Sequence, residues 1–134
     1  ILQKINYYNR YVYIGTPCPL NMEDLKIYYR KINNGDYVHP KDVKVDTLSI
    51  THAQIPAEAV AKLNIPVDDL FIYDRVFSIM NHDTANPLSC YHAEGGHQRW
   101  VRTNLTHTSM SIGDVICVMG EYMMCDRYGW TTLV

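Results

Sequence analysis

Residues 115–126 read VICVMGEYMMCD, two apolar runs separated by Gly120-Glu121. A glycine at the first position of a two-residue connection favours a type II′ turn, which joins two antiparallel strands. The pattern therefore predicts a C-terminal β-hairpin of Val115–Met119 and Tyr122–Asp126. Because successive positions in both runs are apolar, both faces of each strand should be covered, and we expect the hairpin inside a sheet rather than at its edge.

The hairpin contains Cys117 and Cys125, the two cysteines closest in sequence. The expected turn places Cys117 opposite Met124, and Cys125 opposite Ile116 on the other face of the sheet. Their Cβ atoms then point apart, which a disulfide cannot tolerate. The first residues, Ile1–Tyr8, lack the pattern of a secretory signal. We therefore expect reduced thiols and a cytoplasmic location, in the host cell if the protein is viral.

The rest of the chain alternates between patterns typical of strands and of helices. Runs rich in Tyr, Val and Ile predict strands at 5–14, 43–50 (with a bulge), 98–105 and 131–134. Apolar residues spaced three and four apart predict helices at 21–32, 56–63 and 67–80, and turn-forming residues predict a long loop at 81–96. Together these segments predict a single α+β domain over residues 1–134, with a mixed or antiparallel sheet and two main helices.

The two main helices have different apolar patterns. In the segment 21–32, Leu25, Tyr28, Tyr29 and Ile32 follow the i, i+3, i+4, i+7 spacing of one helix face. The segment 67–80 carries two such stripes, made of Leu70, Tyr73, Phe77 and Met80 and of Ile72, Val76 and Ile79. A helix that is apolar on two sides is either enclosed within the fold or shared with a second copy of the chain.

Composition limits the classes of function. The 134 residues are 47% hydrophobic and carry a formal net charge of −2, which excludes a disordered chain and argues against binding driven by phosphate neutralisation. No apolar run is long enough to span a bilayer. The chain has eleven tyrosines and only two phenylalanines. Tyrosine suits half-exposed sheet faces and contact surfaces, because a large apolar ring ends in a polar hydroxyl.

Two segments near the C-terminus carry a family resemblance. Residues 107–116 read HTSMSIGDVI and residues 125–130 read CDRYGW. This Ser-x-Ser-x-Gly-Asp-Val block, followed by a hairpin and a Gly-aromatic pair, resembles a module of small phage and mobile-element proteins, the YodL-like family among them. The resemblance covers about 107–131 and implies a viral or plasmid origin, with no catalytic residues to carry over. The N-terminal half takes no part in it.

The same block has a physical interpretation of its own. The hydroxyls of Ser109 and Ser111 can satisfy backbone groups in a turn, Gly113 permits positive φ, and Asp114 can accept backbone N–H bonds before the strand begins. Gly129–Trp130 is expected to turn the chain back so that the indole covers the hairpin. The alternative is that Asp114 and the serines line a binding surface.

The long loop and its surroundings hold the candidate chemistry. Cys90, His92 and His97 are residue types that bind zinc, but their spacing matches no zinc motif, and a fourth ligand would have to come from His82 or elsewhere. We therefore predict no metal and no cofactor. The candidate binding residues of the whole chain are His92, His97, Arg99, Trp100, Arg102 and Asp114.

Arg99, Trp100 and Arg102 combine charge with a stacking surface, as base-stacking platforms do. On the expected strand, Trp100 and Arg102 share one face while Arg99 takes the other, so sheet packing is favoured over nucleic-acid binding. We expect a non-catalytic phage or mobile-element accessory protein that binds another macromolecule, a protein above all, away from membranes. The alternative is a small metal- or nucleic-acid-dependent enzyme that uses the region 82–102.

Overall fold

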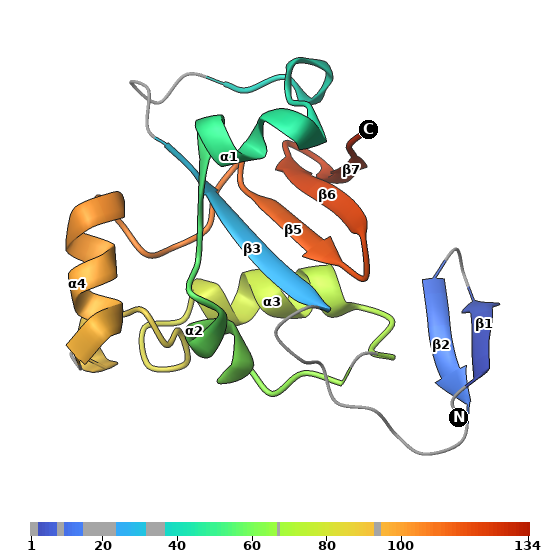
Figure 1. The fold of residues 1–134 in the computed structure, drawn as a ribbon, viewed down its shortest axis with the longest axis horizontal. Coiled ribbons are helices and arrows are strands. Elements are labelled where there is room, and N and C mark those ends of the chain that lie inside the picture. The colour runs from blue at the N-terminus through green and yellow to red at the C-terminus, as the bar shows by residue number, and fades with distance from the viewer. Residues whose placement is uncertain (1–2, 8–9, 15–23, 32–36, 67, 93–94) are drawn as a thin grey trace.

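A five-stranded antiparallel sheet in the order β4-β3-β5-β6-β7 organises the chain (Figure 1). The computed structural model describes residues 3–7, 10–14, 24–31, 37–66, 68–92 and 95–134. The strands of the sheet are β3 (Leu25–Arg30), β4 (His52–Gln54), β5 (Val115–Val118), β6 (Glu121–Asp126) and β7 (Gly129–Thr132). The helices are α1 (Leu48–Thr51), α2 (Ala57–Ala61), α3 (Ile72–Met80) and α4 (Gly95–Asn104). The α+β class and the antiparallel sheet are confirmed.

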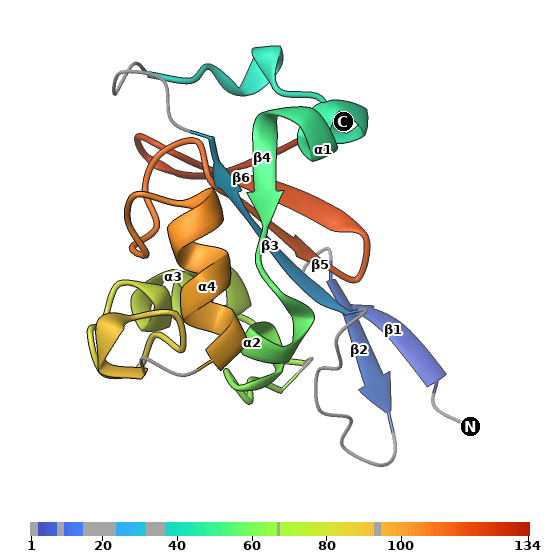
Figure 2. The ribbon, with the colours of Figure 1, turned by 60° about the vertical axis from the view of Figure 1, so that its left-hand side comes forward.

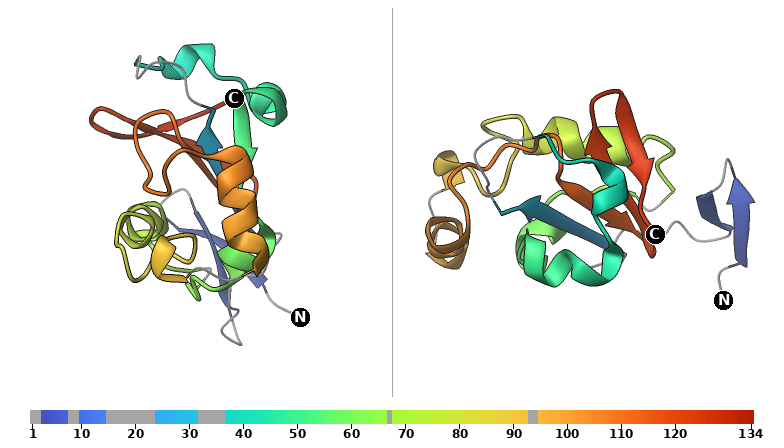
Figure 3. Two further views of the ribbon diagram at one scale, coloured as in Figure 1. Left: turned by 90° about the vertical axis from the view of Figure 1, so that its left-hand side faces the viewer. Right: turned by 90° about the horizontal axis from the view of Figure 1, so that it is seen from above.

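The predicted strand 5–14 is instead a separate hairpin. Two strands, β1 (Gln3–Tyr7) and β2 (Arg10–Ile14), pair antiparallel with Ile5 opposite Val12 and form a sheet of their own. Figures 1 and 3 show this hairpin beside the five-stranded sheet and not joined to it. The Tyr-, Val- and Ile-rich pattern thus indicated strand structure correctly but missed that the run belongs to two strands paired with each other.

Each face of the five-stranded sheet carries its own core. On the first face, alternate residues of β3 and β5 pack against α2 and α3; this first core includes Leu25, Ile27, Tyr29, Ala59, Val60, Ile72, Val76, Met80, Ile116 and Val118. The second face carries Tyr28, Val115, Cys117 and Met124 beneath Val43, Leu48 and Leu133. Figure 2 shows α1 at one end of the strands and α2, α3 and α4 toward the other.

The C-terminal hairpin is confirmed, with β5 enclosed between β3 and β6 as predicted, but its turn lies one residue earlier than expected. Val118 pairs with Glu121, so Met119-Gly120 forms the connection, and both residues have positive φ (51° and 85°). Positive φ at both central positions is the geometry of a type I′ turn rather than type II′. The N–H of Met119 donates to the carbonyl of Asp24 at 2.7 Å, which extends the pairing of β5 with the start of β3.

The shifted register leaves the cysteine prediction intact. Cys117 lies opposite Tyr122 rather than Met124, and this displacement of two residues keeps every side chain on its face. Cys117 therefore belongs to the second face, whereas Cys125 pairs with Trp130 on the first. Cys90, Cys117 and Cys125 are free, as predicted, and Cys18 lies outside the described residues.

The helix predicted at 21–32 is wrong where the structure describes it, because residues 25–30 form strand β3. Leu25, Ile27 and Tyr29 are at most 2% exposed on the first face, and Tyr28 is 8% exposed on the second. A strand buried on both faces reads as a nearly continuous apolar run, which satisfies a helical spacing as well as an alternating one. Residues 21–23 and 32 lie outside the described part of the chain.

Two predicted strands are helical. The segment 43–50 forms the 3₁₀ turn Val45–Thr47 and helix α1, because its two deeply buried residues, Val43 and Leu48, are five positions apart and cannot share a strand face. The segment 98–105 is mostly helix α4. There the backbone N–H of Leu105 donates to the carbonyl of Val101 at 2.8 Å, the bond of a regular helical turn.

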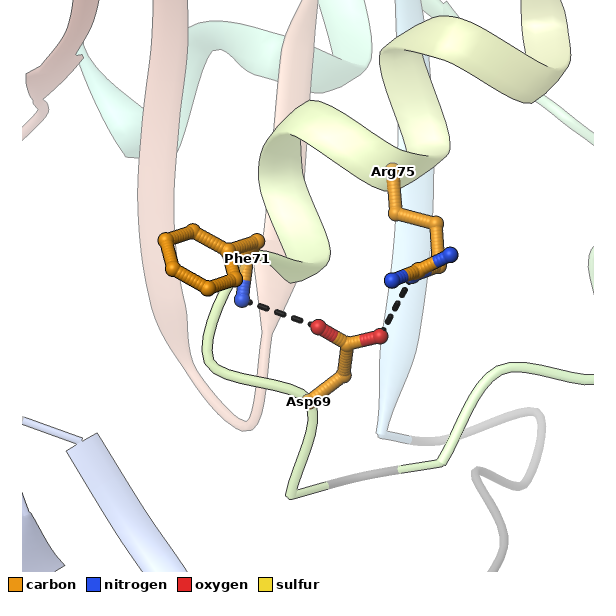
Figure 4. A network of polar contacts seen from close by, with 3 residues as sticks. All are labelled: Asp69, Phe71 and Arg75. Carbon is orange, nitrogen blue, oxygen red and sulfur yellow. Dashed lines mark hydrogen bonds and ion pairs between the residues drawn. The ribbon is translucent and has the colours of Figure 1, made fainter.

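The helices predicted at 56–63 and 67–80 are confirmed with shorter bounds as α2 and α3, and the loop predicted at 81–96 gives way to α4 at Gly95. Before α3, the carboxylate of Asp69 accepts the N–H of Phe71 at 2.9 Å and forms an ion pair with Arg75 (Figure 4). Both stripes of α3 are covered or partly covered within the chain, one by the first core and the other by Trp130.

We predict that Asp69→Ala lowers the free energy of unfolding by about 1 kcal/mol, because it removes a capping bond and an ion pair at the start of α3. Chemical denaturation measures the change. The matched control is Asp68→Ala, at the exposed neighbouring residue, which should alter stability by less than about 0.5 kcal/mol. Equal effects of the two substitutions would contradict the capping role.

We predict that Gly120→Ala destabilises the chain by about 1 kcal/mol through backbone strain alone. An added Cβ would meet no atom within 4 Å, so packing does not contribute. Gly120→Asn should cost less than Gly120→Ala, because asparagine tolerates the left-handed region. If thermal unfolding ranked the alanine variant as the more stable of the two, the type I′ turn would be wrong.

Candidate functional site

Two open hollows lie around α1 and share the side chain of His52. The first hollow, of about 360 Å³, is lined by Tyr28, Val45, Asp46, Leu48, Ser49, His52, Gln54 and Tyr122. The second, of about 340 Å³, is lined by Arg30, Lys31, Val38, Asp42, Val43, Ile50, Thr51 and His52. Both open onto the second face of the sheet, next to its core.

Two tyrosines form the wall of the first hollow on the sheet side. The ring centroids of Tyr28 and Tyr122 are 6.2 Å apart, with the planes tilted by 37°. Tyr28 and Cys117 belong to the second core, and Tyr122 packs against it. Burial raises the pKa of both tyrosine hydroxyls, so both are neutral at physiological pH.

His52 is held from both ring nitrogens. It is 3% exposed, its Nε2 lies 2.7 Å from the carbonyl of Gly113, and its Nδ1 lies 2.8 Å from the hydroxyl of Thr51. Because a carbonyl can only accept, the hydrogen of the neutral ring sits on Nε2, and Nδ1 is the acceptor. The single hydroxyl hydrogen of Thr51 is shared between this Nδ1 and the carbonyl of Thr47, 3.1 Å from the hydroxyl. Burial lowers the pKa of His52, and the nearby charges of Arg30 and Lys31 lower it further. The imidazole is therefore uncharged at neutral pH.

Asp114 fastens the Ser-x-Ser-x-Gly-Asp block to β3. It is 1% exposed, and its two carboxylate oxygens accept the backbone N–H groups of Arg30 and Ser111, each at 2.8 Å. Burial raises the pKa of Asp114 to about 6, against the opposing effect of these two bonds. Gly113 has φ +98°, a conformation that favours glycine, and a Cβ there would make a tight contact with Arg30, 3.1 Å from its Cδ.

The serines of the block act through their backbone in the described contacts. Ser111 donates its N–H to Asp114 and accepts the N–H of Asp114 at 3.1 Å, while the carbonyl of the exposed Ser109 lies 2.8 Å from Nδ1 of His107. The hydroxyls therefore do not explain this turn in the way we expected. The carboxylate, buried and bonded on both oxygens, is placed to hold the corner rather than to meet a ligand.

Gly129–Trp130 turns the chain back at the start of β7. Gly129 has φ +123°, and the indole of Trp130 packs against α3, with ring centroids 5.6 Å from Tyr73 and 6.0 Å from Phe77. The indole N–H donates to the carboxylate of Asp74 at 2.9 Å. Trp130 thus joins the last strand to the helix.

The histidines of the long loop serve separate contacts. His92 is exposed, with Nε2 2.6 Å from the carbonyl of Thr84, and His97 is partly exposed on α4. Among the described residues, no group of three or more His, Cys, Asp or Glu side chains could hold a metal ion.

Arg99, Trp100 and Arg102 lie on helix α4 and not on the expected strand, and the helix separates the groups that a stacking platform would need. Arg99 and Arg102 are three residues apart and exposed, so they share the outer face of the helix. Trp100 is partly buried and packs against the first core. The indole therefore stabilises the fold, and the two arginines have no aromatic ring between them.

Comparison of the chain with protein-family models, with curated proteins and with solved structures finds no match. Within the described residues, no helix is long and apolar enough to cross a membrane.

The two hollows around His52 were missed by sequence reasoning. Their walls come from β3, β6 and the segment 38–54, so no local motif marks them. The excess of tyrosine over phenylalanine was the available signal, because Tyr28 and Tyr122 place hydroxyls where a core would use phenylalanine.

We predict that at about pH 4 Asp114→Asn lowers the free energy of unfolding by about 2–3 kcal/mol, since the amide NH2 would face a backbone N–H that a carboxyl oxygen, protonated or not, can accept. Asp114 binds its proton more tightly in the folded chain, where its pKa is about 6, than in the unfolded chain. The stability that wild type owes to Asp114 therefore falls as pH rises through about 4 to 6. Denaturation at several pH values should show the variant's deficit shrinking over that range. A deficit independent of pH, or matched by the exposed control Asp83→Asn, would contradict this assignment.

Proposed function

We propose that this chain is a non-catalytic accessory protein of a phage or mobile element that binds a partner protein, in the cytoplasm, through the surface around α1. The observation that carries the proposal is Ile50, which is 72% exposed on α1 and lines the second hollow. An exposed apolar side chain at the rim of a concavity offers a partner protein apolar surface to cover.

The composition of this surface supports a protein as the partner. Tyr28, Tyr122 and Arg30 belong to the residue types that contribute most energy at protein interfaces. The tyrosine rings are held by packing against each other and against the second core, so little conformational entropy is lost when a partner covers them.

The buried ionisable groups support a non-catalytic role. Both ring nitrogens of His52 and both carboxylate oxygens of Asp114 are engaged within the chain. A general acid or base must instead reach the proton that it transfers. The alternative, an enzyme using 82–102, has weaker support, because His92 bonds to a loop carbonyl and Trp100 packs on the core.

The proposed phage or mobile-element origin of the protein rests on the resemblance of residues 107–131 to the YodL-like module. In that block, Gly113 and Asp114 hold the corner that leads into β5, and Gly129 begins β7. The backbone geometry at these three positions favours glycine, aspartate and glycine, the residue types that the module also has. This supports a common fold for residues 107–131 and the YodL-like module.

The test is affinity capture from the natural host, with wild type compared with two variants. Ile50→Asp places a charge on the proposed surface, and Tyr91→Asp does so at a residue of similar exposure, 67%, in the long loop. We predict that at least one protein is retained by wild type and Tyr91→Asp but falls about tenfold or more with Ile50→Asp. Circular dichroism checks that both variants fold. Identical capture by all three chains would make the proposal wrong.

A further inference from the structure

We infer that the first hollow binds an organic cation, the ammonium or guanidinium group of a basic side chain on the partner protein. This inference rests on the proposed function and specifies its chemistry. The hollow combines two aromatic rings with one carboxylate, and these are the two groups that recognise such cations.

The aromatic part is the pair Tyr28 and Tyr122. The planes of the two rings are tilted by 37° and their centroids are 6.2 Å apart. The rings therefore form two adjoining parts of the wall of the hollow. A cation within about 6 Å of a tyrosine ring is attracted by the negative face of the ring. The volume, about 360 Å³, accommodates the end of a lysine or arginine side chain.

The charge of the lining has the sign that a cation requires. Asp46, exposed at the rim, contributes the negative charge, while the two phenols and the buried imidazole of His52 are neutral at physiological pH. Beyond the lining, Lys26 and Glu121 act on the neighbouring Cys117 with opposite signs, so they oppose one another. The first hollow is therefore acidic overall.

The second hollow has the opposite character. Arg30 and Lys31 outweigh the single carboxylate of Asp42 among its lining residues. The two hollows share His52, and Ile50 and Thr51 line only the second. A partner segment that places a basic side chain in the first hollow and an acidic one in the second matches both charges, which fixes its direction across α1.

The test uses Nα-acetyl-L-lysine methylamide, with the uncharged Nα-acetyl-L-norleucine methylamide as the matched probe. Each is titrated into ¹⁵N-labelled protein. We expect the lysine probe to shift the amide signals of Asp46, Ser49, Gln54 and Tyr122 saturably, and the norleucine probe to leave them unchanged. Asp46→Asn should weaken binding at least fivefold. The control Asp42→Asn, which removes a carboxylate from the second hollow, should not.

The contribution of the Tyr122 ring to binding of the cation is tested separately from that of its hydroxyl. Tyr122→Phe keeps the aromatic face and should retain binding within about twofold, whereas Tyr122→Leu should weaken it as much as Asp46→Asn does. Equal shifts with the two probes, or full binding by Asp46→Asn, would overturn the inference. If the Ile50-dependent partner is still captured by Asp46→Asn at the wild-type level, the proposed function stands and only the cation site is wrong.

Discussion

The carboxylate of Asp114 is the contact on which the arrangement of the second face depends. It binds the backbone of β3 through Arg30 and the turn before β5 through Ser111, so it fixes where these two neighbouring strands begin and end relative to each other. Next to it, the carbonyl of Gly113 receives His52 from β4. One buried corner thus connects three strands that lie far apart in sequence, and burial makes each bond costly to lose.

The candidate site follows from that corner. Once His52 is held at the carbonyl of Gly113, helix α1, which ends at the preceding residue, is fixed against the sheet, and Ile50 is left facing solvent. The imidazole then separates a hollow with tyrosines and a carboxylate from one with two basic side chains. The polar groups of His52 and Asp114 are therefore engaged in holding the fold, and the proposed recognition is left to the partly exposed ring of Tyr122 and to the charged side chains around the hollows.

Sequence alone predicted the features that depend on neighbouring residues. The β5–β6 hairpin and helices α2 and α3 were predicted because a short turn and a helical stripe each depend on residues that are close in sequence. Strand β3 was mistaken for a helix because its burial on both faces is imposed by β4 and β5, which the local pattern does not contain. The hollows could not be predicted at all, since Tyr28, His52 and Tyr122 meet only after the sheet has formed.

The order of the strands also constrains when the chain can fold. Strand β3 pairs directly with β5, so Ile27 finds its partner Ile116 only after residues 28–116 have been synthesised. Closing so long a loop is entropically expensive, and contacts of this range slow folding. Until then β3, with its row of Ile and Tyr side chains, has an unpaired edge toward solvent, a state that invites association with other nascent chains or with a chaperone. Synthesis of β5 ends that exposure, because β5 pairs with this edge of β3.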